Sequence, residues 1–261
     1  MRQDPRRRQP RELPEQIEGQ LEGRNALTEA LKSGRTIDKV FIASGETDRA
    51  LQRLAAEAKE AGAVVVPVDR RKLDAMSTTH AHQGVIALAA AKEYCNIDDI
   101  LQEAADRGEC PLIVICDELS DPHNLGAILR SAECAGAHGV IIPKRRSVGL
   151  TATVAKASAG AVEYMKVARV TNINSAISEL KEKGVWVFGT AAEGSIPMYQ
   201  ADLTVPAAIV IGSEGDGMSQ LVRKNCDVIV HIPMKGRITS LNASAAASIL
   251  LYEAVRQRLS K

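Results

Sequence analysis

Short apolar runs that end in glycine-bearing loops recur along the 261-residue chain and are most distinct near its carboxyl end. Residues 209–211 (IVI) lead into residues 212–217 (GSEGDG), and residues 228–230 (VIV) lead into residues 232–242. Such β-branched runs are typical of buried parallel strands whose carboxyl ends hold a ligand. Because glycines let a backbone approach a ligand closely, we expect recognition there by exposed N–H and C=O groups.

The first third of the chain alternates between strand and helix patterns. Strands are predicted at residues 39–43, 64–66 and 84–91, and helices at residues 24–31, 47–61 and 70–76. In the longest helix, the apolar positions 51, 54, 55 and 58 fall on one face. This alternation predicts a compact α/β unit, which we place at residues 16–92.

A second α/β unit is predicted at residues 111–261. Residues 93–110 are polar, and we interpret them as a linker with a short helix at 97–105. Besides the two strands already named, the pattern predicts strands at 112–116, 139–142, 164–167 and 185–188, and helices at 124–135, 151–159, 174–183 and 241–259. This order predicts a mostly parallel sheet covered by helices.

Composition limits the partners. The net charge is +1, so a polyanion must be met by local basic patches. Two Phe and one Trp argue against base-stacking platforms that use several aromatic rings per site. Residues 1–15 hold five arginines and three prolines and are expected to form a disordered basic tail. That tail is either a solubilising terminus or a nucleic-acid contact.

Five cysteines without CxxC spacing indicate reduced, buried thiols in a cytoplasmic protein and predict no zinc site. His80 and His82 lie in a loop without a cysteine or acid to complete a metal site. No apolar run reaches the ~18 residues of a transmembrane helix. The basic amino terminus also lacks the apolar segment of a secretory signal.

Several polar residues next to apolar helices are candidates for chemistry. Asn124 is placed as an N-cap or first helical residue, and Arg130 lies six residues further on, away from its face. An arginine on such an apolar helix is either paired with a buried acid or aimed at a phosphate or carboxylate. Ser240 or Asn242 is an N-cap candidate for the last helix. The loop at 212–217 does not match GxGxxG and is either a structural turn or a backbone clamp.

Three segments carry a family resemblance: NLGAILRSAECAG at 124–136, IVIGSEGDGM at 209–218 and IPMKGRITSLNASAAASILLYE at 232–253. They resemble the three motifs of the SpoU/TrmH family of 2'-O-ribose RNA methyltransferases, in the SPOUT superfamily. Earlier, EGRNALTEAL and HQGVIAL resemble the family's L30e-like RNA-binding domain. The combination is most similar to the RlmB type, which methylates a guanosine 2'-hydroxyl in the peptidyl-transferase loop of 23S ribosomal RNA.

The resemblance implies an α/β fold with a parallel-sheet SPOUT domain and a deep trefoil knot, preceded by a small L30e-like RNA-binding domain. It implies S-adenosyl-L-methionine (AdoMet) as cofactor and a homodimer with the active site across the two chains. The implied cofactor-binding residues are Thr190, Gly212, Glu214, Ile232, Met234, Gly236 and Leu241. The implied catalytic residues are Arg130, Asn124, Glu214, Ser240 and Asn242. The expected RNA-binding residues are Arg24, His82, Gln83, Lys144, Arg145 and Arg146.

Family analogy proposes Arg130 as base or orienter of the ribose hydroxyl. An arginine with a pKa above ~12 is a poor base, so we prefer a role in gripping a phosphate or stabilising the developing alkoxide. The run 144–146 contacts RNA or is a solvated loop. Small residues at 156–160 allow either a close RNA contact or a tight dimer interface. The alternatives for function are another ribosomal or transfer RNA site, an inactive RNA-binding relative, or an unrelated nucleotide-binding enzyme.

Overall fold

The computed structural model describes residues 19–45, 48–79, 81–191, 195–213, 215 and 217–260. The chain divides into two compact units, Met1–Ala89 and Ala90–Lys261, and each is considered by itself. The predicted basic tail, His80 and Glu214 lie outside the described residues. Among the described residues, no helix is both long and apolar enough to span a membrane.

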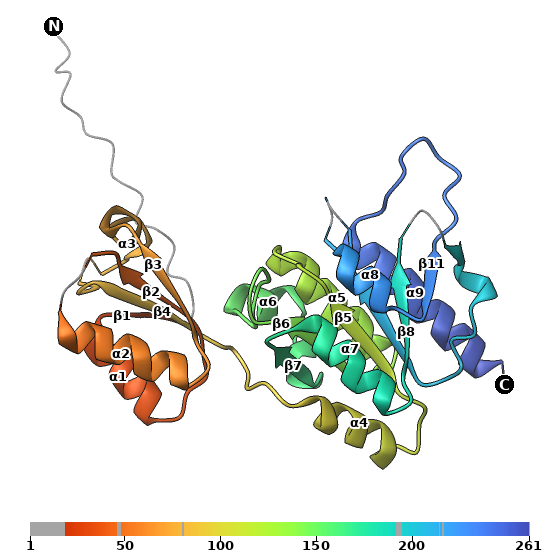
Figure 1. Ribbon diagram of the computed structural model, residues 1–261, viewed down its shortest axis with the longest axis horizontal. Coiled ribbons are helices and arrows are strands. Elements are labelled where there is room, and N and C mark those ends of the chain that lie inside the picture. The colour runs from red at the N-terminus through yellow and green to blue at the C-terminus, as the bar shows by residue number, and fades with distance from the viewer. Residues whose placement is uncertain are drawn as a thin grey trace, which may run out of the picture. The chain divides into compact units, whose positions relative to one another are not determined.

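The first unit is a four-stranded mixed sheet with helices against it (Figure 1). Strand order is β1-β4-β2-β3, and only the β2–β3 pair is parallel. The elements are β1 (Gln20–Glu22), α1 (Arg24–Lys32), β2 (Ile37–Ala43), α2 (Arg49–Glu60), β3 (Val64–Val68), α3 (Arg70–Met76) and β4 (Val85–Ala89). The predicted elements of this unit are confirmed within a few residues, whereas β1 was missed because it has only three residues.

The helices of this unit cover the two faces of the sheet unequally. Leu27 of α1 and Leu51 and Leu54 of α2 pack into one core with the alternate strand residues Val40 and Val85. On the other face, the short helix α3 contributes a smaller cluster around Leu73. Part of that second face is therefore left without a helix over it.

The second unit is built on a parallel seven-stranded sheet, in the order β7-β6-β5-β10-β8-β11-β9. Its strands are β5 (Leu112–Cys116), β6 (Gly139–Pro143), β7 (Val167–Val170), β8 (Trp186–Thr190), β9 (Ile196–Pro197), β10 (Ala207–Ile211) and β11 (Val228–His231). Its helices are α4 (Ile97–Asp106), α5 (Pro122–Cys134), α6 (Ala152–Ala157), α7 (Ile173–Glu182), α8 (Gln220–Asn225) and α9 (Ala243–Leu259), with 3₁₀ turns at Ala161–Glu163 and Met198–Gln200. The prediction of a parallel α/β sheet is confirmed.

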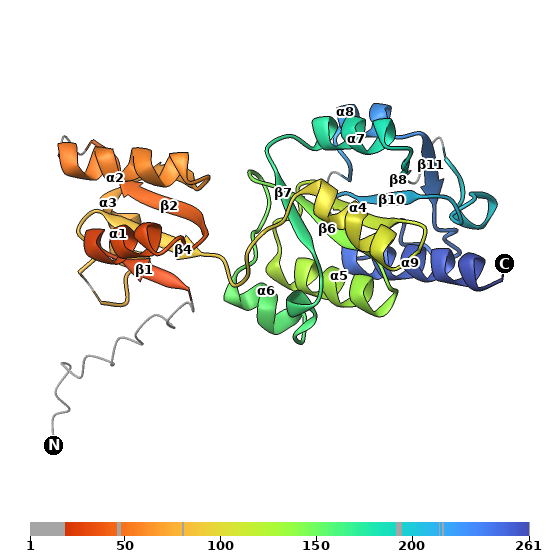
Figure 2. The same ribbon diagram turned by 90° about the horizontal axis from the view of Figure 1, so that it is seen from below.

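Both faces of this sheet are buried, because successive residues of a strand point to opposite sides. In β5, Leu112 and Val114 join the core under α5, α6 and α9. Ile113 and Ile115 join the core under α4, α7 and α8. Figure 2 shows α5, α6 and α9 along one face and α7 and α8 along the other. The trefoil knot implied by the family resemblance stays a prediction.

The segment 93–110, interpreted from the sequence as a linker, is an integral part of the second unit. Its helix α4 buries Ile97 and Ile100 against the sheet. The contact is so close that a Cβ on Gly139 would lie 2.6 Å from Ile100 Cδ1. The amphipathic pattern of the segment thus serves packing on the sheet rather than a free connection.

Three further sequence predictions are corrected. Strand β7 begins at Val167, whereas the predicted strand began at Tyr164, an exposed residue after a 3₁₀ turn. Helix α5 begins at Pro122 with Asp121 as N-cap, so Asn124 is the third helical residue rather than a cap. The five cysteines are unpaired as expected, but only Cys116 is buried, and Cys134 is exposed.

Candidate active site

The carboxyl ends of β10, β8 and β11 form the centre of the candidate site. These strands are hydrogen-bonded neighbours in a parallel sheet, so their ends lie on one edge. Gly212 follows β10, Thr190 ends β8 and Ile232 follows β11. Because adjacent strands lie ~4.8 Å apart, the three positions fall within about 10 Å across the sheet. The structure therefore brings together three of the implied cofactor residues.

Gly212 stands where no side chain fits. A Cβ there would lie 2.2 Å from the carbonyl carbon of Gly217 and 2.3 Å from the nitrogen of Met218. The loop is folded back on itself, since Ser213 and Gly217 exchange two backbone hydrogen bonds of 3.0 and 3.1 Å. Gly212 is buried, yet its own N–H and C=O make no hydrogen bond with the described residues. These groups are therefore available to a ligand, as expected for a backbone clamp.

Residues 233–241, between β11 and α9, share this property. Among the described residues, none of their backbone groups makes a hydrogen bond. Figure 1 shows this segment as a long loop beyond the ends of the strands. Its apolar side chains Met234, Ile238 and Leu241 are exposed, and Gly236 lies between them. A segment with unpaired donors, acceptors and exposed apolar groups suits a ligand that has both a polar and an apolar part.

Thr190 and Ile232 support the site from the sheet. The Thr190 hydroxyl donates to the Val210 carbonyl oxygen at 2.9 Å and so ties the end of β8 to β10. Ile232 is half-buried and packs against the core under α5 and α9. Both positions thus fix the strand ends from which the loops emerge.

Helices α5 and α9 meet beside this edge through two amide side chains. The Asn242 Nδ2 donates to Asn124 Oδ1 at 2.9 Å. Asn242 is also the N-cap of α9, where its Oδ1 accepts from the backbone N–H groups of Ser244 and Ala245. Asn124 is only 5% exposed. The two predicted catalytic asparagines are therefore brought together, while Ser240 lies exposed in the preceding loop.

Arg130 lies further along α5 and faces outward. Its side chain makes no ion pair or hydrogen bond with the described residues, and the position is exposed. The neighbouring Ser131 hydroxyl bonds to that of Ser248 on α9 at 2.7 Å. Of the two interpretations left open by the sequence, an acid partner is not found in the described part of the chain. Arg130 is free to meet a phosphate or an oxyanion.

Asp117 is a site residue that the sequence analysis missed. It follows β5, is 4% exposed, and its Oδ2 accepts from the backbone N–H of Ser219 at 2.8 Å. Its own N–H donates to the Ile211 carbonyl at 2.8 Å, one residue before Gly212. Asp117 therefore holds both ends of the loop 212–219. An acidic residue directly after a buried strand was the one available signal.

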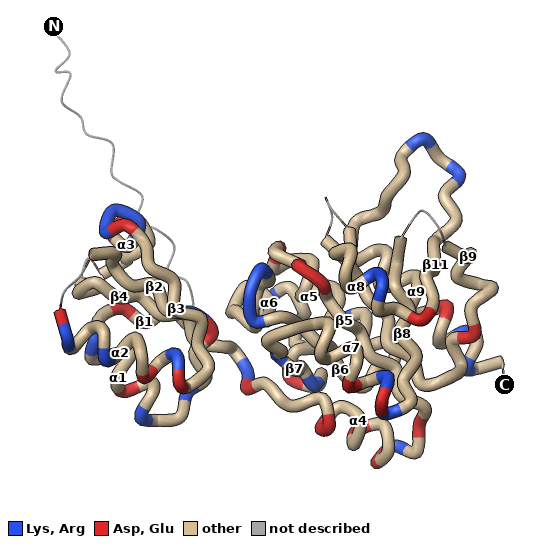
Figure 3. The backbone as a smooth tube through the Cα atoms, in the orientation of Figure 1, with Lys and Arg blue, Asp and Glu red and all other residues tan. Residues whose placement is uncertain are grey.

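The basic run after β6 lies on the same sheet edge. Lys144 N–H donates to the Val170 carbonyl, whereas Arg146 Nη1 pairs with Glu118 Oε1 at 3.0 Å. Arg145 is exposed and has no partner among the described residues. Figure 3 shows Lys and Arg gathered on this loop and on the long loop after β11. The second loop carries Lys235 and Arg237.

In the first unit, the loop that leads into β4 is held by one carboxylate. Glu22 accepts from the Ser77 hydroxyl at 2.6 Å and from Thr78 N–H at 2.7 Å, and it also bonds to Thr79. Burial raises the pKa of Glu22, but the hydrogen bonds from Ser77, Thr79, Thr78 and Gln20 outweigh burial and hold it well below its ordinary value. The conformation of the loop is thus fixed by hydrogen bonds within the unit.

Two of the expected RNA-binding residues already bond to other residues of this unit. Arg24 pairs with Asp48 and donates from Nε to the Gln83 carbonyl at 3.2 Å. His82 is 4% exposed; its Nε2 lies 3.0 Å from Asp74 Oδ1, and its Nδ1 accepts from Gly84 N–H. A buried ring with both nitrogens engaged offers no edge to RNA. In this structure His82 shapes the loop, and a direct contact of His82 with RNA stays a prediction.

The small residues at 156–160 pack within the chain. A Cβ on Gly126 of α5 would lie 2.5 Å from Ala157 Cβ and 2.9 Å from Ser158 N. Ser158 is fully buried, and its hydroxyl donates to Ala155. Close packing of α6 on α5 accounts for the small residues, so neither an RNA contact nor a dimer interface is needed to explain them.

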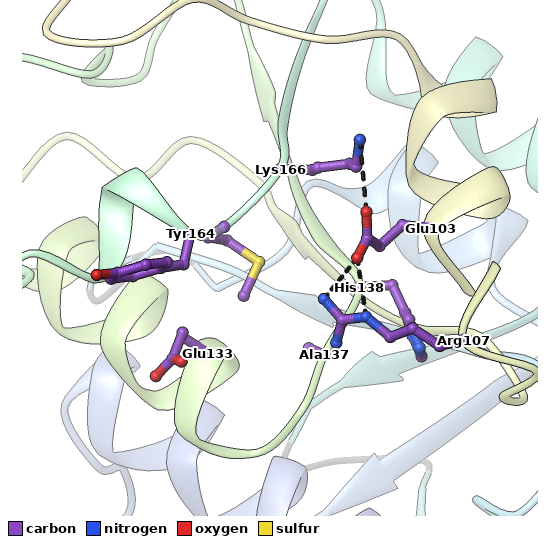
Figure 4. A pocket seen from close by; sticks show the side chains of 8 residues that line it. Glu103, Arg107, Glu133, Ala137, His138, Tyr164 and Lys166 are labelled. Carbon is purple, nitrogen blue, oxygen red and sulfur yellow. Dashed lines mark hydrogen bonds and ion pairs between the residues drawn. The ribbon is translucent and has the colours of Figure 1, made fainter.

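A cavity of about 60 Å³ lies at the opposite, amino-terminal edge of the sheet, near His138 (Figure 4). Three of the charged residues that line it are paired, because Glu103 bonds to Arg107 at 2.7 Å and to Lys166 at 3.5 Å. His138 is buried between Glu109 and the Leu112 N–H, and burial lowers its pKa. The cavity is therefore part of the packing between α4 and the sheet.

The sequence matches two family models. Residues 111–252 match the SpoU rRNA Methylase family, and residues 20–95 match the family described as RNA 2'-O ribose methyltransferase substrate binding. The chain is 49% identical over 236 residues to the "Putative TrmH family tRNA/rRNA methyltransferase YacO" of Bacillus subtilis, covering 90% of this chain and 94% of the relative. A Staphylococcus aureus protein named "Putative TrmH family tRNA/rRNA methyltransferase" is 46% identical, covering 90% and 95%.

Solved structures agree. The SpoU methyltransferase AviRb from Streptomyces viridochromogenes, in complex with AdoMet, has a TM-score of 0.60 at 26% identity and covers 93% of this chain and 91% of that chain. The AdoMet-bound rRNA methyltransferase from Sinorhizobium meliloti has a TM-score of 0.57 at 26% identity, covering 91% and 86%. The TrmH/SpoU tRNA modifying enzyme of A. aeolicus has a TM-score of 0.54 at 28% identity, covering 58% and 77%.

Proposed function

Because this chain belongs to the SpoU rRNA methylase family of AdoMet-dependent RNA methyltransferases, we propose that it methylates 23S ribosomal RNA at the 2'-hydroxyl of a guanosine in the peptidyl-transferase loop. The observation that carries the proposal is the presence of a substrate-binding unit and a methylase unit on one chain. The Sinorhizobium meliloti rRNA methyltransferase aligns with 91% of this chain, whereas the A. aeolicus tRNA modifying enzyme aligns with 58%. This difference favours ribosomal over transfer RNA.

The residues at the strand ends fit the cofactor. AdoMet has a purine with donors and acceptors, an apolar ring surface and a methyl group on a positively charged sulfur. The unpaired backbone of Gly212 and of residues 233–241 supplies hydrogen-bond partners, and the exposed Met234 and Leu241 supply apolar contact. Thr190, Ile232 and Gly236 complete this cofactor site. Glu214 belongs to the same proposal from the sequence motif alone.

Arg130 acts on the RNA rather than on the cofactor. A ribose 2'-hydroxyl must lose its proton as its oxygen attacks the methyl carbon, and negative charge then grows on that oxygen. A free guanidinium stabilises this charge or fixes the adjacent phosphate through two parallel N–H bonds. The paired Asn124 and Asn242, together with Ser240, orient the ribose. Arg145 and Lys144 meet RNA phosphates at the rim.

The active enzyme is a homodimer in this proposal. Ile249 and Tyr252 lie three residues apart on α9 and are 37% and 52% exposed. Helix α9 packs against α5, on which Arg130 is also exposed. Apolar groups at such a position suit a second copy of the chain. In analytical sedimentation, the wild-type protein is expected to be a dimer and the Tyr252→Glu variant a monomer. A wild-type protein that is monomeric and active would contradict the proposed dimer.

The substrate is tested by transfer of labelled methyl groups from AdoMet to RNA from a strain that lacks the gene. We expect the label in 23S ribosomal RNA, with one new site that resists alkaline hydrolysis at a guanosine of the peptidyl-transferase loop. Label in transfer RNA alone would replace this proposal with the transfer-RNA alternative. AdoMet binding by titration calorimetry without methylation of either RNA would indicate an inactive RNA-binding relative.

A further inference from the structure

One part of the first unit's sheet has no helix over it. Residues Lys39, Phe41 and Ala43 alternate along β2 and therefore share one face. Helix α3 covers the end of this face through Leu73, which packs with Ala43. Phe41 packs at the margin of this cluster, and both Lys39 and Phe41 are only half-buried. On the opposite face, α1 and α2 bury the alternate residues of the same strand.

Two lysines converge on the Phe41 ring. Lys39 Nζ lies 5.9 Å from the ring centroid, and Lys72 Nζ, from α3, lies 5.7 Å from it. Neither ammonium group makes an ion pair or hydrogen bond with the described residues. Two like charges that share one ring repel each other, so an anion bound between them lowers the energy.

Two of the three residues expected to bind RNA in this unit are already engaged within the unit. Arg24 is tied to Asp48 and Gln83, and His82 is buried. Lys39 and Lys72 are cations from separate elements that share an aromatic ring, and neither has an ion-pair partner within the described part of the chain. Figure 3 shows further positive charge along α3, which carries Arg70 and Arg71 next to Lys72. This face is therefore the better placed surface for a polyanion.

We propose that the Phe41 face is a contact site for single-stranded RNA, in which one base stacks on the Phe41 ring and Lys39 and Lys72 hold the flanking phosphates. The proposal deepens the proposed function, because it names the surface with which the substrate-binding unit holds unpaired RNA. Stacking needs only one ring per base and tolerates any base. The low aromatic content excludes platforms with several rings, and Phe188, the second phenylalanine, is buried in the other unit.

The test is binding of a labelled single-stranded 12-nucleotide RNA to the full-length protein, followed by fluorescence anisotropy. Phe41→Leu keeps an apolar side chain but removes the π face, and a loss of affinity of about 5- to 150-fold is expected, at about 1–3 kcal/mol per stacked base. The double variant Lys39→Gln/Lys72→Gln is expected to bind at least about tenfold more weakly. Its salt dependence is expected to flatten by about 1.4 in the slope of log K against log salt, at ~0.7 per phosphate contact.

The matched control is Arg49→Gln/Lys59→Gln, which removes the same charge from exposed positions of α2, on the helix-covered side. We expect less than a twofold change from it, and AdoMet affinity unchanged in every variant. An unaltered affinity of Phe41→Leu, or equal losses in the two double variants, would overturn the proposal. The proposal would also be overturned if poly-glutamate displaced the RNA and Phe41→Leu had no effect on RNA binding. The attraction between protein and RNA would then be purely ionic.

The outcome is separable from that of the proposed function. If 23S ribosomal RNA is not methylated but Phe41→Leu weakens binding of the oligonucleotide, the contact site stands and the substrate assignment falls. If 23S ribosomal RNA is methylated and Phe41→Leu binds like wild type, the substrate assignment stands and the contact site falls.

Discussion

The loop at residues 77–83 and the segment at residues 233–241 are prepared for their partners in opposite ways. The first is fixed by Glu22, which accepts hydrogen bonds from Ser77 and from both Thr78 and Thr79. The second makes no backbone hydrogen bond among the described residues. If these are the contact regions, as we propose, the first unit offers RNA a preformed loop, whereas the methylase unit offers AdoMet a set of backbone groups that are unpaired among the described residues.

The difference has an energetic consequence. Fixing the backbone of one residue costs about 1–2 kcal/mol, and in the loop at 77–83 folding itself has met this cost. In the cofactor site that we propose, the segment at 233–241 meets this cost when AdoMet binds, so the AdoMet affinity is expected to depend on how well the rest of the site is preformed. The supports of that site, Gly212 and Asp117, are therefore where small changes have large effects on binding.

The largest expected effect on catalysis comes from Arg130 of the methylase unit, which we compare with Arg24 of the first unit. Arg130 has no partner among the described residues, whereas Arg24 is paired with Asp48. Arg130→Ala is expected to lower kcat about 10²- to 10³-fold with little change in AdoMet affinity, as for loss of an oxyanion-stabilising donor. Arg24→Ala is expected to weaken RNA binding and leave kcat at saturating RNA unchanged. Single-turnover methyl transfer at saturating RNA measures the contrast.

Arg130→Lys tests the geometry of the guanidinium. A lysine keeps the charge but loses the planar pair of donors, so most of the kcat loss is expected to persist. Near-wild-type turnover of this variant would show that a point charge is enough, and the role given to Arg130 would be wrong.

The second largest effect is expected at Gly212. Gly212→Ala places a Cβ 2.2 Å from the carbonyl carbon of Gly217, so the backbone of the loop must move. A strain of about 3 kcal/mol corresponds to roughly a 100-fold loss of AdoMet affinity. Gly215→Ala in the same loop is the control, since its Cβ meets nothing within 4 Å. Calorimetric titration with AdoMet distinguishes the two, and equal affinities would remove Gly212 from the cofactor site.

Sequence patterns predicted elements that bury a regular face. The helix at 70–76 was predicted with the bounds that α3 has, and the central strands of both sheets were found, because period and burial agree there. The strands β1 and β9 have three and two residues and carry no detectable period. Tyr164 extended one predicted strand wrongly, since an apolar run does not show where a 3₁₀ turn interrupts it.

The candidate site was predictable where residues act through local motifs. Gly212 and Asn242 stand at the ends of a strand and at the start of a helix, and both positions are readable from spacing. The role of Asp117 could not be predicted from the sequence, because its contact with Ser219 joins positions 102 residues apart. The ion pair of Arg24 with Asp48 and the burial of His82 could not be predicted for the same reason. Partners distant in the chain decide whether a polar residue is free to act.

Asp117 offers a smaller, graded test of preformation in the methylase unit. Asp117→Ala leaves the Ser219 N–H without its acceptor, which costs about 1–2 kcal/mol, or roughly tenfold in AdoMet affinity. Asp117→Asn retains an oxygen acceptor and is expected to bind AdoMet within about threefold of wild type. A positioning role predicts that AdoMet KM rises while kcat at saturation is kept. An equal loss in Asn and Ala variants would instead show that the charge itself is required.

The smallest effect is expected from Glu22, which fixes the preformed loop of the first unit. Its pKa is held below the ordinary value of 4.5, so its contribution to folding is complete above that pH and is lost as pH falls towards the lowered pKa. Glu22→Gln keeps the shape but weakens the charge-assisted bonds, and about a threefold loss of RNA affinity at pH 7 is expected. Hydrogen exchange should quicken at residues 77–79 and stay unchanged at residues 233–241. Faster exchange in both regions would mean that the two loops are not independent, and the contrast between them would fail.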